Sequence, residues 1–166
     1  MQPLIVPCAF AVPRSAVTPR VRLDDGEITV PFTVPATMQA AQALPDPPTA
    51  APAAGATRSV KLVALAWGRS GDKGDLSNIG LIARRPEWLP LLWAQVTPAA
   101  VLAWLGHLVK GPVDRYHLPG LSAMNLVIHQ ALDGGGPASL RLDPLGKGMA
   151  QMLLELPITV PADWPV

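Results

Sequence analysis

Short apolar runs alternate with polar or glycine-rich stretches through the second half of the chain. VKLVALAW at residues 60–67 and NIGLIAR at residues 78–84 each have the length of a buried strand. VDRYHL at residues 113–118 is predicted as a further short strand that ends at Pro119. The pattern therefore predicts at least three strands in this half of the chain.

A helix is predicted over residues 97–109, TPAAVLAWLGHLV. Thr97 is a good N-cap, and Pro98 would occupy the first helical position, where its missing N–H costs nothing. The Gly111-Pro112 pair would end the helix. Its predicted apolar face consists of Val101, Leu102, Leu105, Leu108 and Val109.

Two later segments allow less certain assignments. LSAMNLVIHQAL at residues 121–132 has helical spacing, yet Asn125–Ile128 equally fits a strand. SLRLD at residues 139–143 and GMAQMLLELPI at residues 148–158 flank the turn-forming Pro144–Lys147 and predict a terminal hairpin. Strands on both sides of helices predict an α+β fold, with a mainly antiparallel sheet and helices on one face.

The first part of the chain differs in composition from the rest. Residues 1–38 contain six prolines, and VRLDDGEITVPF at residues 21–32 is typical of a β-hairpin with its turn at Asp24–Gly26. A lone hairpin buries too little surface to be stable, so this N-terminal β arm needs something to lie against. Residues 39–57 hold eight alanines and four prolines and are predicted to be a linker. Residues 58–166 form the predicted domain.

Composition narrows the classes of function. The chain is 49% hydrophobic, only 15% charged and carries a formal net charge of +1 without a basic block, which argues against a nucleic-acid partner. Its single cysteine, Cys8, excludes an intrachain disulfide and favours a cytoplasmic location. The apolar stretch 88–109 is long enough for a membrane span, but Pro90, Gln95 and Pro98 divide it and favour a core helix.

The most unusual segment is polar. GRSGDKGDLSN at residues 68–78 lies between two apolar runs, and five consecutive residues, Arg69–Lys73, are polar or glycine. Gly71 and Gly74 would let a ligand approach backbone N–H groups, and Arg69 or Lys73 would add positive charge. Asp72 or Asp75 could then act as a general base. The alternative is a tight connection in which these side chains only cap local N–H groups. The density of polar residues favours a binding role.

Other chemistries have less support in the sequence. The three histidines have no shared metal-ligand spacing, so neither a metal nor a bound cofactor is predicted. The GxxxxGK[ST] spacing of a nucleotide-binding loop is absent from the polar segment. Arg115, Tyr116 and Asn125 are the remaining polar residues that we consider able to reach this segment in three dimensions, although spacing alone does not show it.

Two sequence motifs resemble those of a known protein family. GRSGDKGDLSNIGLIAR, followed by VDRYHLPGLSAMNLVIHQALDGGGPASLRLDPLGKGMAQMLLELPI, resembles the C-terminal domain of the acyclic terpene utilisation protein A (AtuA) family. The likeness covers about residues 58–160 and implies a ferredoxin-like fold. His117 departs from the pattern, because the family more often has an acidic residue there.

The resemblance also implies a partner. Family members usually carry a large α/β domain ahead of the small one, and residues 9–32 resemble the closing strands of that domain, more weakly. We therefore expect a small subunit that docks through residues 1–38 on a separate large AtuA-type chain. The family is associated with the catabolism of branched or terpenoid acids as coenzyme A thioesters. Coenzyme A would enter only as part of the substrate, and no membrane partner is expected.

The implied chemistry is a hydratase or lyase step on an acyl-CoA thioester. Asp72 or Asp75 would move the proton, while Lys73, Asn78 and glycine N–H groups would hold an oxyanion or a coenzyme A phosphate. Two alternatives remain, a non-catalytic module that stabilises or regulates a large partner, and an enzyme acting alone. The expected catalytic residues are Asp72, Asp75 and Lys73, and the expected substrate-binding residues are Arg69, Ser70, Gly71, Gly74, Asn78, Arg115, Tyr116 and Asn125.

Overall fold

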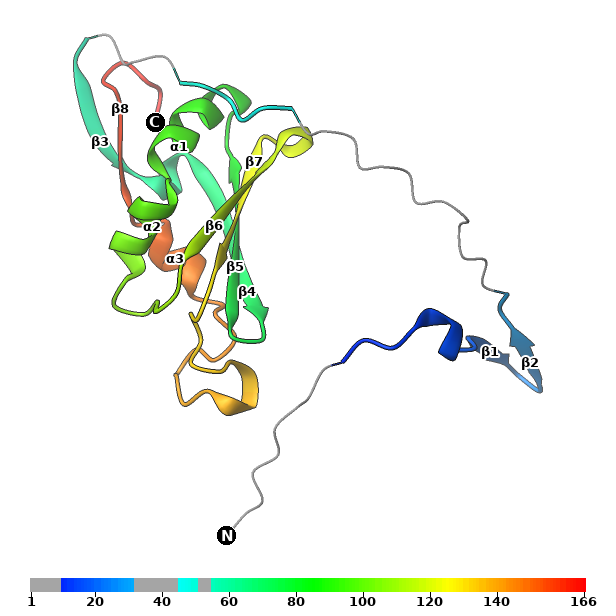
Figure 1. Cartoon of the computed structure of the whole chain (residues 1–166). Coiled ribbons are helices and arrows are strands. Elements are labelled where there is room, and N and C mark those ends of the chain that lie inside the picture. Colours follow the sequence, from blue (N-terminus) through cyan, green and yellow to red (C-terminus); the bar gives the residue numbers. More distant parts are fainter. Residues whose placement is uncertain (1–9, 32–44, 51–54) are drawn as a thin grey trace. The chain divides into compact units, whose positions relative to one another are not determined.

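The computed structural model describes residues 10–31, 45–50 and 55–166 (Figure 1). The chain divides into two compact units, residues 1–43 and 44–166. Most of the predicted linker, residues 39–44 and 51–54, lies outside the described residues, as does Cys8.

The described part of the first unit contains the predicted hairpin. A short 3-10 turn, η1 (Arg14–Ala16), precedes β1 (Arg20–Leu23) and β2 (Gly26–Thr29), which pair antiparallel. Strand alternation separates two faces. Arg20 and Arg22 both form ion pairs with Glu27 on one face, at 2.9 and 3.4 Å. The other face carries three exposed apolar side chains, those of Val21, Leu23 and Ile28.

The second unit is built on a four-stranded antiparallel sheet. Its strands are β4 (Ala66–Lys73), β5 (Leu76–Ala83), β6 (Val113–Leu118) and β7 (Ala123–Ile128), in the order β4-β5-β7-β6. A separate two-stranded sheet pairs β3 (Thr57–Lys61) with β8 (Pro157–Pro161). The prediction of a strand at residues 113–118 is confirmed, and the open question at residues 121–132 is answered by a strand.

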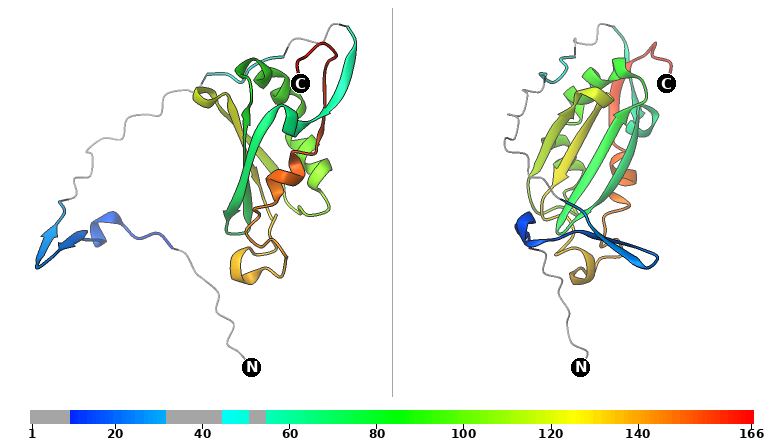
Figure 2. Two further views of the ribbon diagram at one scale, coloured as in Figure 1. Left: turned by 180° about the vertical axis from the view of Figure 1, so that it is seen from behind. Right: turned by 90° about the vertical axis from the view of Figure 1, so that its right-hand side faces the viewer.

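The helices cover one face of the four-stranded sheet, and the opposite face is left open (Figure 2). Thr97 caps α2 as predicted, because its hydroxyl accepts a hydrogen bond from the Ala100 N–H at 3.1 Å. The α-helices are α1 (Leu89–Gln95), α2 (Pro98–Leu105) and α3 (Met149–Leu153), and the further 3-10 turns are η2 (Leu62–Ala64), η3 (Pro86–Trp88), η4 (Pro119–Leu121) and η5 (Gly136–Ala138).

The core lies between the helices and the covered face of this sheet. Ile79 on β5, Leu126 on β7 and Val101 on α2 are all fully buried. Alternate residues of β5 and β7 point into this core, and the residues between them point to the open face. The predicted α+β, ferredoxin-like class, with an antiparallel sheet, helices on one face and an N-terminal hairpin, is confirmed.

Three boundary predictions were wrong. Residues 60–67 are not one strand, because β3 ends at Lys61 and a 3-10 turn then places Leu62 and Leu65 in the core before β4 begins at Ala66. The predicted terminal hairpin does not form, since residues 149–153 are helical and β8 pairs with β3 instead. The helix predicted to reach residue 109 ends at Leu105.

Within the described residues, no single helix is both long and apolar enough to cross a membrane. Residues 86–95 and 98–105 meet that test only when they are taken together, and the two helices are bent by 69° at their junction.

Candidate functional site

The polar segment is a β-hairpin rather than a loop. β4 runs to Lys73, β5 begins at Leu76, and Gly74 and Asp75 form the two-residue turn. Gly74 has a φ of +67°, a conformation that glycine adopts without a steric cost. Residues that the sequence groups along one segment are therefore divided between the two faces of a sheet.

The open face gathers six of the predicted residues. Cross-strand register places Arg69 beside Gly80, Gly80 beside Asn125, and Asn125 beside Tyr116, so that one row crosses all four strands. In the adjoining row Gly71 pairs with Asn78, whose side-chain N–H donates to the Asn125 Oδ1 atom at 2.5 Å. The predicted residues on this face are Arg69, Gly71, Lys73, Asn78, Tyr116 and Asn125.

Ser70 and Arg115 point to the covered face, where their polar atoms have structural partners. The buried Ser70 hydroxyl donates to the Lys147 carbonyl at 3.0 Å and accepts from the Ala150 N–H at 2.9 Å. Arg115 donates to the Trp93 and Val96 carbonyls at the end of α1, and its guanidinium lies 3.7 Å from the centre of the Trp93 ring. Burial lowers the pKa of Arg115 from its ordinary value.

Gly74 and Asp75, at the turn, are held by the glycine-rich segment of residues 133–136. The Asp75 carboxylate accepts the N–H groups of Leu132 and Gly134 at 3.2 and 2.8 Å. A Cβ atom on Gly135 would lie 2.0 Å from the Gly74 carbonyl oxygen, so only glycine fits there. Asp75 thus has a structural task that the sequence did not suggest.

A hollow of about 150 Å³ opens at the edge strand β4. Arg69, Lys73 and Lys147 bring three cations to it, and Gly71 and Gly80 leave its floor without side chains. Asp72 also lines it, although strand alternation places Asp72 on the same side of β4 as Ser70. Lys73 donates to the Asp72 carbonyl at 2.8 Å. Among the described residues, the charged groups of Arg69, Asp72 and Lys147 have no hydrogen-bond or ion-pair partner. No contact within the described chain therefore neutralises these three residues, which line the hollow.

Lys147 is the residue that sequence reasoning missed. It lies far along the chain in the Pro144–Lys147 turn, where the simplest interpretation is a solvated side chain. In the structure, a Cβ atom added to Gly71 would lie 2.9 Å from the Lys147 Nζ atom, so the ammonium lies directly over that glycine. Its backbone is fixed on both sides, by the Ser70 hydroxyl and by the Asp143 carboxylate, which accepts the Lys147 N–H at 2.9 Å.

An apolar hollow of about 270 Å³ adjoins the first on the same face. Its exposed apolar side chains are Trp67, Ile82 and Leu121, which are 52%, 43% and 63% exposed. Arg69 and Gly80 line both hollows. The open face thus has a cationic half and an apolar half that meet at these two residues.

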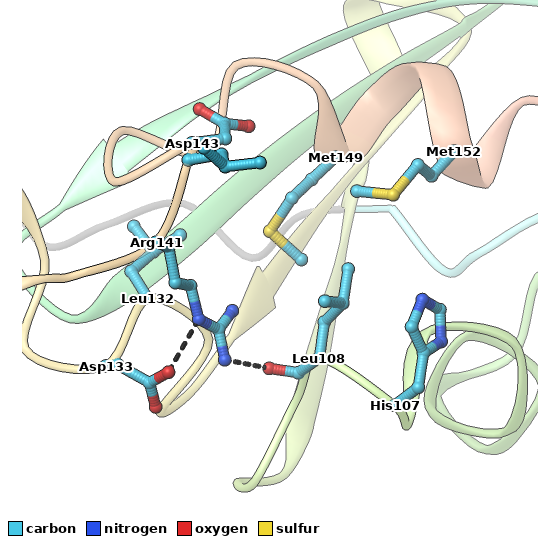
Figure 3. Close-up of a pocket in the computed structure, with 9 residues that line it drawn as sticks. His107, Leu108, Leu132, Asp133, Arg141, Asp143, Met149 and Met152 are labelled. Atoms are coloured by element: carbon cyan, nitrogen blue, oxygen red, sulfur yellow. Dashed lines mark hydrogen bonds and ion pairs between the residues drawn. The ribbon is translucent and has the colours of Figure 1, made fainter.

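A larger hollow of about 560 Å³ lies between the end of α2, α3 and the segment 132–143 (Figure 3). Its arginine and its two aspartates are already engaged in hydrogen bonds. Arg141 donates to Asp133 at 2.7 Å, to the Leu108 carbonyl at 2.6 Å and to the Ala131 carbonyl. Hydrogen bonds from Lys110 and then from Arg141 hold the pKa of Asp133 below its ordinary value. We therefore regard this cavity as a weaker candidate than the open face.

No group of three histidine, cysteine, aspartate or glutamate side chains that could hold a metal ion occurs within the described ranges. His129 contacts Asp114 at 2.8 Å. His117 packs edge-on against Trp93, and its Nδ1 atom is buried without a hydrogen-bond partner.

Comparison with known protein families matches residues 60–159 to the AtuA ferredoxin-like domain. Comparison with curated proteins and with solved structures gave no match. The matched range contains the whole four-stranded sheet, both hollows of its open face, and Lys147. The match spans more than half of the chain and agrees with the antiparallel sheet and its one-sided helices. The chain therefore belongs to the AtuA ferredoxin-like domain family.

Proposed function

We propose that this chain is the small subunit of a heteromeric AtuA-type enzyme that acts on branched or terpenoid acyl-CoA thioesters. The open face of the four-stranded sheet is the surface that it contributes to the active site. The supporting observation is that one small glycine-floored hollow is lined by Arg69, Lys147 and Asp72, whose charged groups have no partner among the described residues. Charged groups that have no partner within the chain are available to a ligand or to a facing chain.

The proposed chemistry is a hydratase or lyase step. Asp72 is the carboxylate to which we assign proton transfer, because Asp75 already accepts two backbone N–H groups. Lys73 and the Asn78 side chain would stabilise the negative charge that develops on the thioester oxygen as the proton leaves. Arg115 and Ser70 are positioned to support the site rather than to touch substrate.

The proposed partner is a large AtuA-type chain that covers the apolar face of the N-terminal hairpin. Val21, Leu23 and Ile28 lie on that face and are 44%, 61% and 57% exposed. A two-stranded hairpin gains stability when a third strand or another surface covers its apolar side. The charged face, with Arg20, Arg22 and Glu27 already paired, would remain in water.

A second candidate is a non-catalytic module that stabilises or regulates the large chain. The observation that favours it is the apolar half of the open face, where Trp67 and Leu121 are more than half exposed. Exposed apolar patches of this kind often mark protein–protein contacts. In this case the cations around Gly71 would meet acidic side chains of the partner.

The experiment is a gentle purification of the full chain from its native cells, followed by acyl-CoA assays of whatever complex is obtained. The proposal predicts a large chain in stoichiometric amount and turnover that is abolished by Asp72→Asn without loss of assembly. An intact complex in which Asp72→Asn leaves the rate unchanged would favour the non-catalytic module. A homo-oligomer without a large chain would contradict both candidates.

A further inference from the structure

The two hollows of the open face share two lining residues, and we refer to them together as the groove. The smaller is lined by cations and glycines and the larger by apolar side chains, and Arg69 and Gly80 belong to both. Gly80 leaves space at this junction, because it has no Cβ atom and nothing lies within 4 Å of where one would be, and Arg69 lies beside it on the edge strand β4. A single elongated ligand could therefore occupy both hollows.

The cationic end is built for a small oxyanion. The main chain of Lys147 is held by two hydrogen bonds, one from the Ser70 hydroxyl of the edge strand and one to the Asp143 carboxylate, so the base of its side chain is fixed without a ligand. Its ammonium lies over Gly71, where only the missing side chain leaves room for it, since an added Cβ atom would lie 2.9 Å from the Nζ atom. Arg69 approaches from the same strand, and both cations lack a counter-ion among the described residues. Charge-assisted hydrogen bonds from such groups are among the stronger polar contacts in proteins.

The other end is built for an apolar chain. Trp67 and Ile82 pair across β4 and β5, and Leu121 lies beside them in η4. Trp67 is four residues from Gly71 on the same strand and the same face, a separation of about 13 Å at the rise of a β-strand. The distance between the two ends therefore limits the length of the ligand.

We propose that this groove binds a medium-chain apolar carboxylic acid or its thioester, with the oxygen-bearing head beside the Lys147 and Arg69 cations and the chain over Trp67. The inference rests on the proposed function for the thioester form, and it adds the orientation of the ligand, its length and the residues that select it. Lys147 and Arg69 select the charge of the head, whereas Trp67 selects the chain. Two unpaired cations favour the free carboxylate over the neutral thioester carbonyl.

The experiment is calorimetric titration of the purified full chain with acetate, hexanoate, decanoate, palmitate and decanoyl-CoA. The inference predicts that affinity rises from acetate to decanoate, by up to about fourfold for each methylene group buried. It also predicts that affinity stops rising once the chain extends past the apolar hollow, so that palmitate binds no more tightly than decanoate. Decanoyl-CoA distinguishes the two sources of the acyl chain, because tighter binding than decanoate identifies the thioester as the preferred ligand.

Three variants separate the two ends of the groove. Lys147→Ala should weaken decanoate binding about tenfold or more, whereas Lys61→Ala, which removes a lysine paired with Glu155 elsewhere, should leave it unchanged. Trp67→Ala should remove the dependence on chain length and leave acetate binding as it was. Gly71→Ala should displace the Lys147 ammonium and weaken binding, while Gly120→Ala, with nothing within 4 Å of the added Cβ atom, is the matched control.

Several results would overturn the inference. These are no detectable binding of any acid, equal affinity for acetate and decanoate, or an unchanged decanoate affinity in both Lys147→Ala and Arg69→Ala. Each leaves the proposed function standing if a large chain co-purifies and the complex turns over acyl-CoA. Conversely, decanoate binding that follows the predicted pattern in a chain that never assembles with a large subunit would support the groove and contradict the proposed function.

Discussion

Arg115 and Arg69 are the same residue type on opposite faces of one sheet, and their surroundings differ in every respect. Arg115 lies on the covered face, where it donates to two carbonyls at the end of α1 and stacks on Trp93. Arg69 lies on the open face, beside a hollow, with no partner among the described residues. The first arginine completes the fold, and the second is available to something that the chain alone does not supply.

The same contrast holds for the serine and the lysine that meet at the edge strand. Ser70 is only 5% exposed, and both its donor and its acceptor capacity are used within the domain. Lys147, which Ser70 anchors, sends its charged end to the other side and pairs with nothing described. The partners of a polar residue in a family motif therefore indicate whether its role is structural or functional. Membership of the motif alone does not separate the two roles.

The largest effect is expected for Arg115→Ala. This change leaves the Trp93 and Val96 carbonyls without their donor and removes the stacked guanidinium, which should lower the free energy of unfolding by about 2–4 kcal/mol. Denaturant unfolding monitored by tryptophan fluorescence measures the change. Arg115→Lys keeps the charge but not the planar, two-pronged geometry, and should recover less than half of the loss. Full recovery by lysine would show that only the charge matters.

Ser70→Ala should come next. The buried Ala150 N–H and the Lys147 carbonyl both lose a partner, at a cost of about 1–3 kcal/mol in the free energy of unfolding. Because this hydroxyl also fixes Lys147, decanoate affinity should fall in the same variant. Ser59→Ala, on the exposed side of β3, is the control and should change neither quantity. Normal stability of Ser70→Ala would contradict the structural role assigned to this hydroxyl.

A smaller effect is expected for the asparagine pair on the open face. Asn125→Ala removes the acceptor of the Asn78 side chain and should cost about 0.5–1.5 kcal/mol, since water reaches this partly exposed site and takes over the bond. Asn78→Ala should cost a similar amount, and the double variant should cost little more than either. Strict additivity in this cycle would mean that the two amides do not interact.

The smallest expected effect is on the pH dependence of stability, and it does not involve the open face. The pKa of Asp133 is lowered in the folded state by the hydrogen bond from Lys110 and then by that from Arg141. A lowered folded pKa gives stability that is present above the unfolded pKa of about 3.9 and is lost as the pH falls through the folded value. Thermal melts between pH 6 and pH 3 should therefore show a steeper acid loss for the wild type than for Asp133→Asn. Asp46→Asn is the matched control, and an equal flattening in it would contradict the assignment.

Local signals were sufficient where a structural element depends on its own residues. The Thr97 hydroxyl caps α2 from three residues away, and Val113–Leu118 forms the predicted strand. Asp24, at the hairpin turn, adopts the positive φ of +47° that such turns require. The antiparallel class follows from these short elements and their turns.

Local signals failed where distant residues decide. Residues 149–153 are helical partly because Ser70, 80 residues earlier, accepts the Ala150 N–H, and no local pattern contains that bond. The helical spacing of the buried Met149, Ala150 and Leu153 was nevertheless present in the sequence and could have corrected the predicted strand. Residues 62–64 turn out of β3 because Leu62 and Leu65 both enter the core, which a continuous apolar run does not reveal.

The candidate site was foreseen in part for the same reason. The polar segment, Asn125 and Tyr116 were selected from the sequence, and the register of the sheet brings them to one face. Arg115 was selected with them, although strand alternation turns it to the other face. Lys147 could not be selected from the sequence, because its turn comes close to Gly71 only in the folded chain. Whether these residues bind substrate stays a prediction.

The central claim is that the open face is reserved for a ligand while the covered face maintains the fold. The most direct test compares Arg69→Ala with Arg115→Ala by measuring, for each variant, the free energy of unfolding and the affinity for decanoate. We predict that Arg69→Ala changes stability by less than about 0.5 kcal/mol and weakens binding about tenfold, whereas Arg115→Ala shows the large stability loss. If Arg69→Ala were instead as destabilising as Arg115→Ala, or bound decanoate as tightly as the wild type, the distinction between the two faces would be wrong.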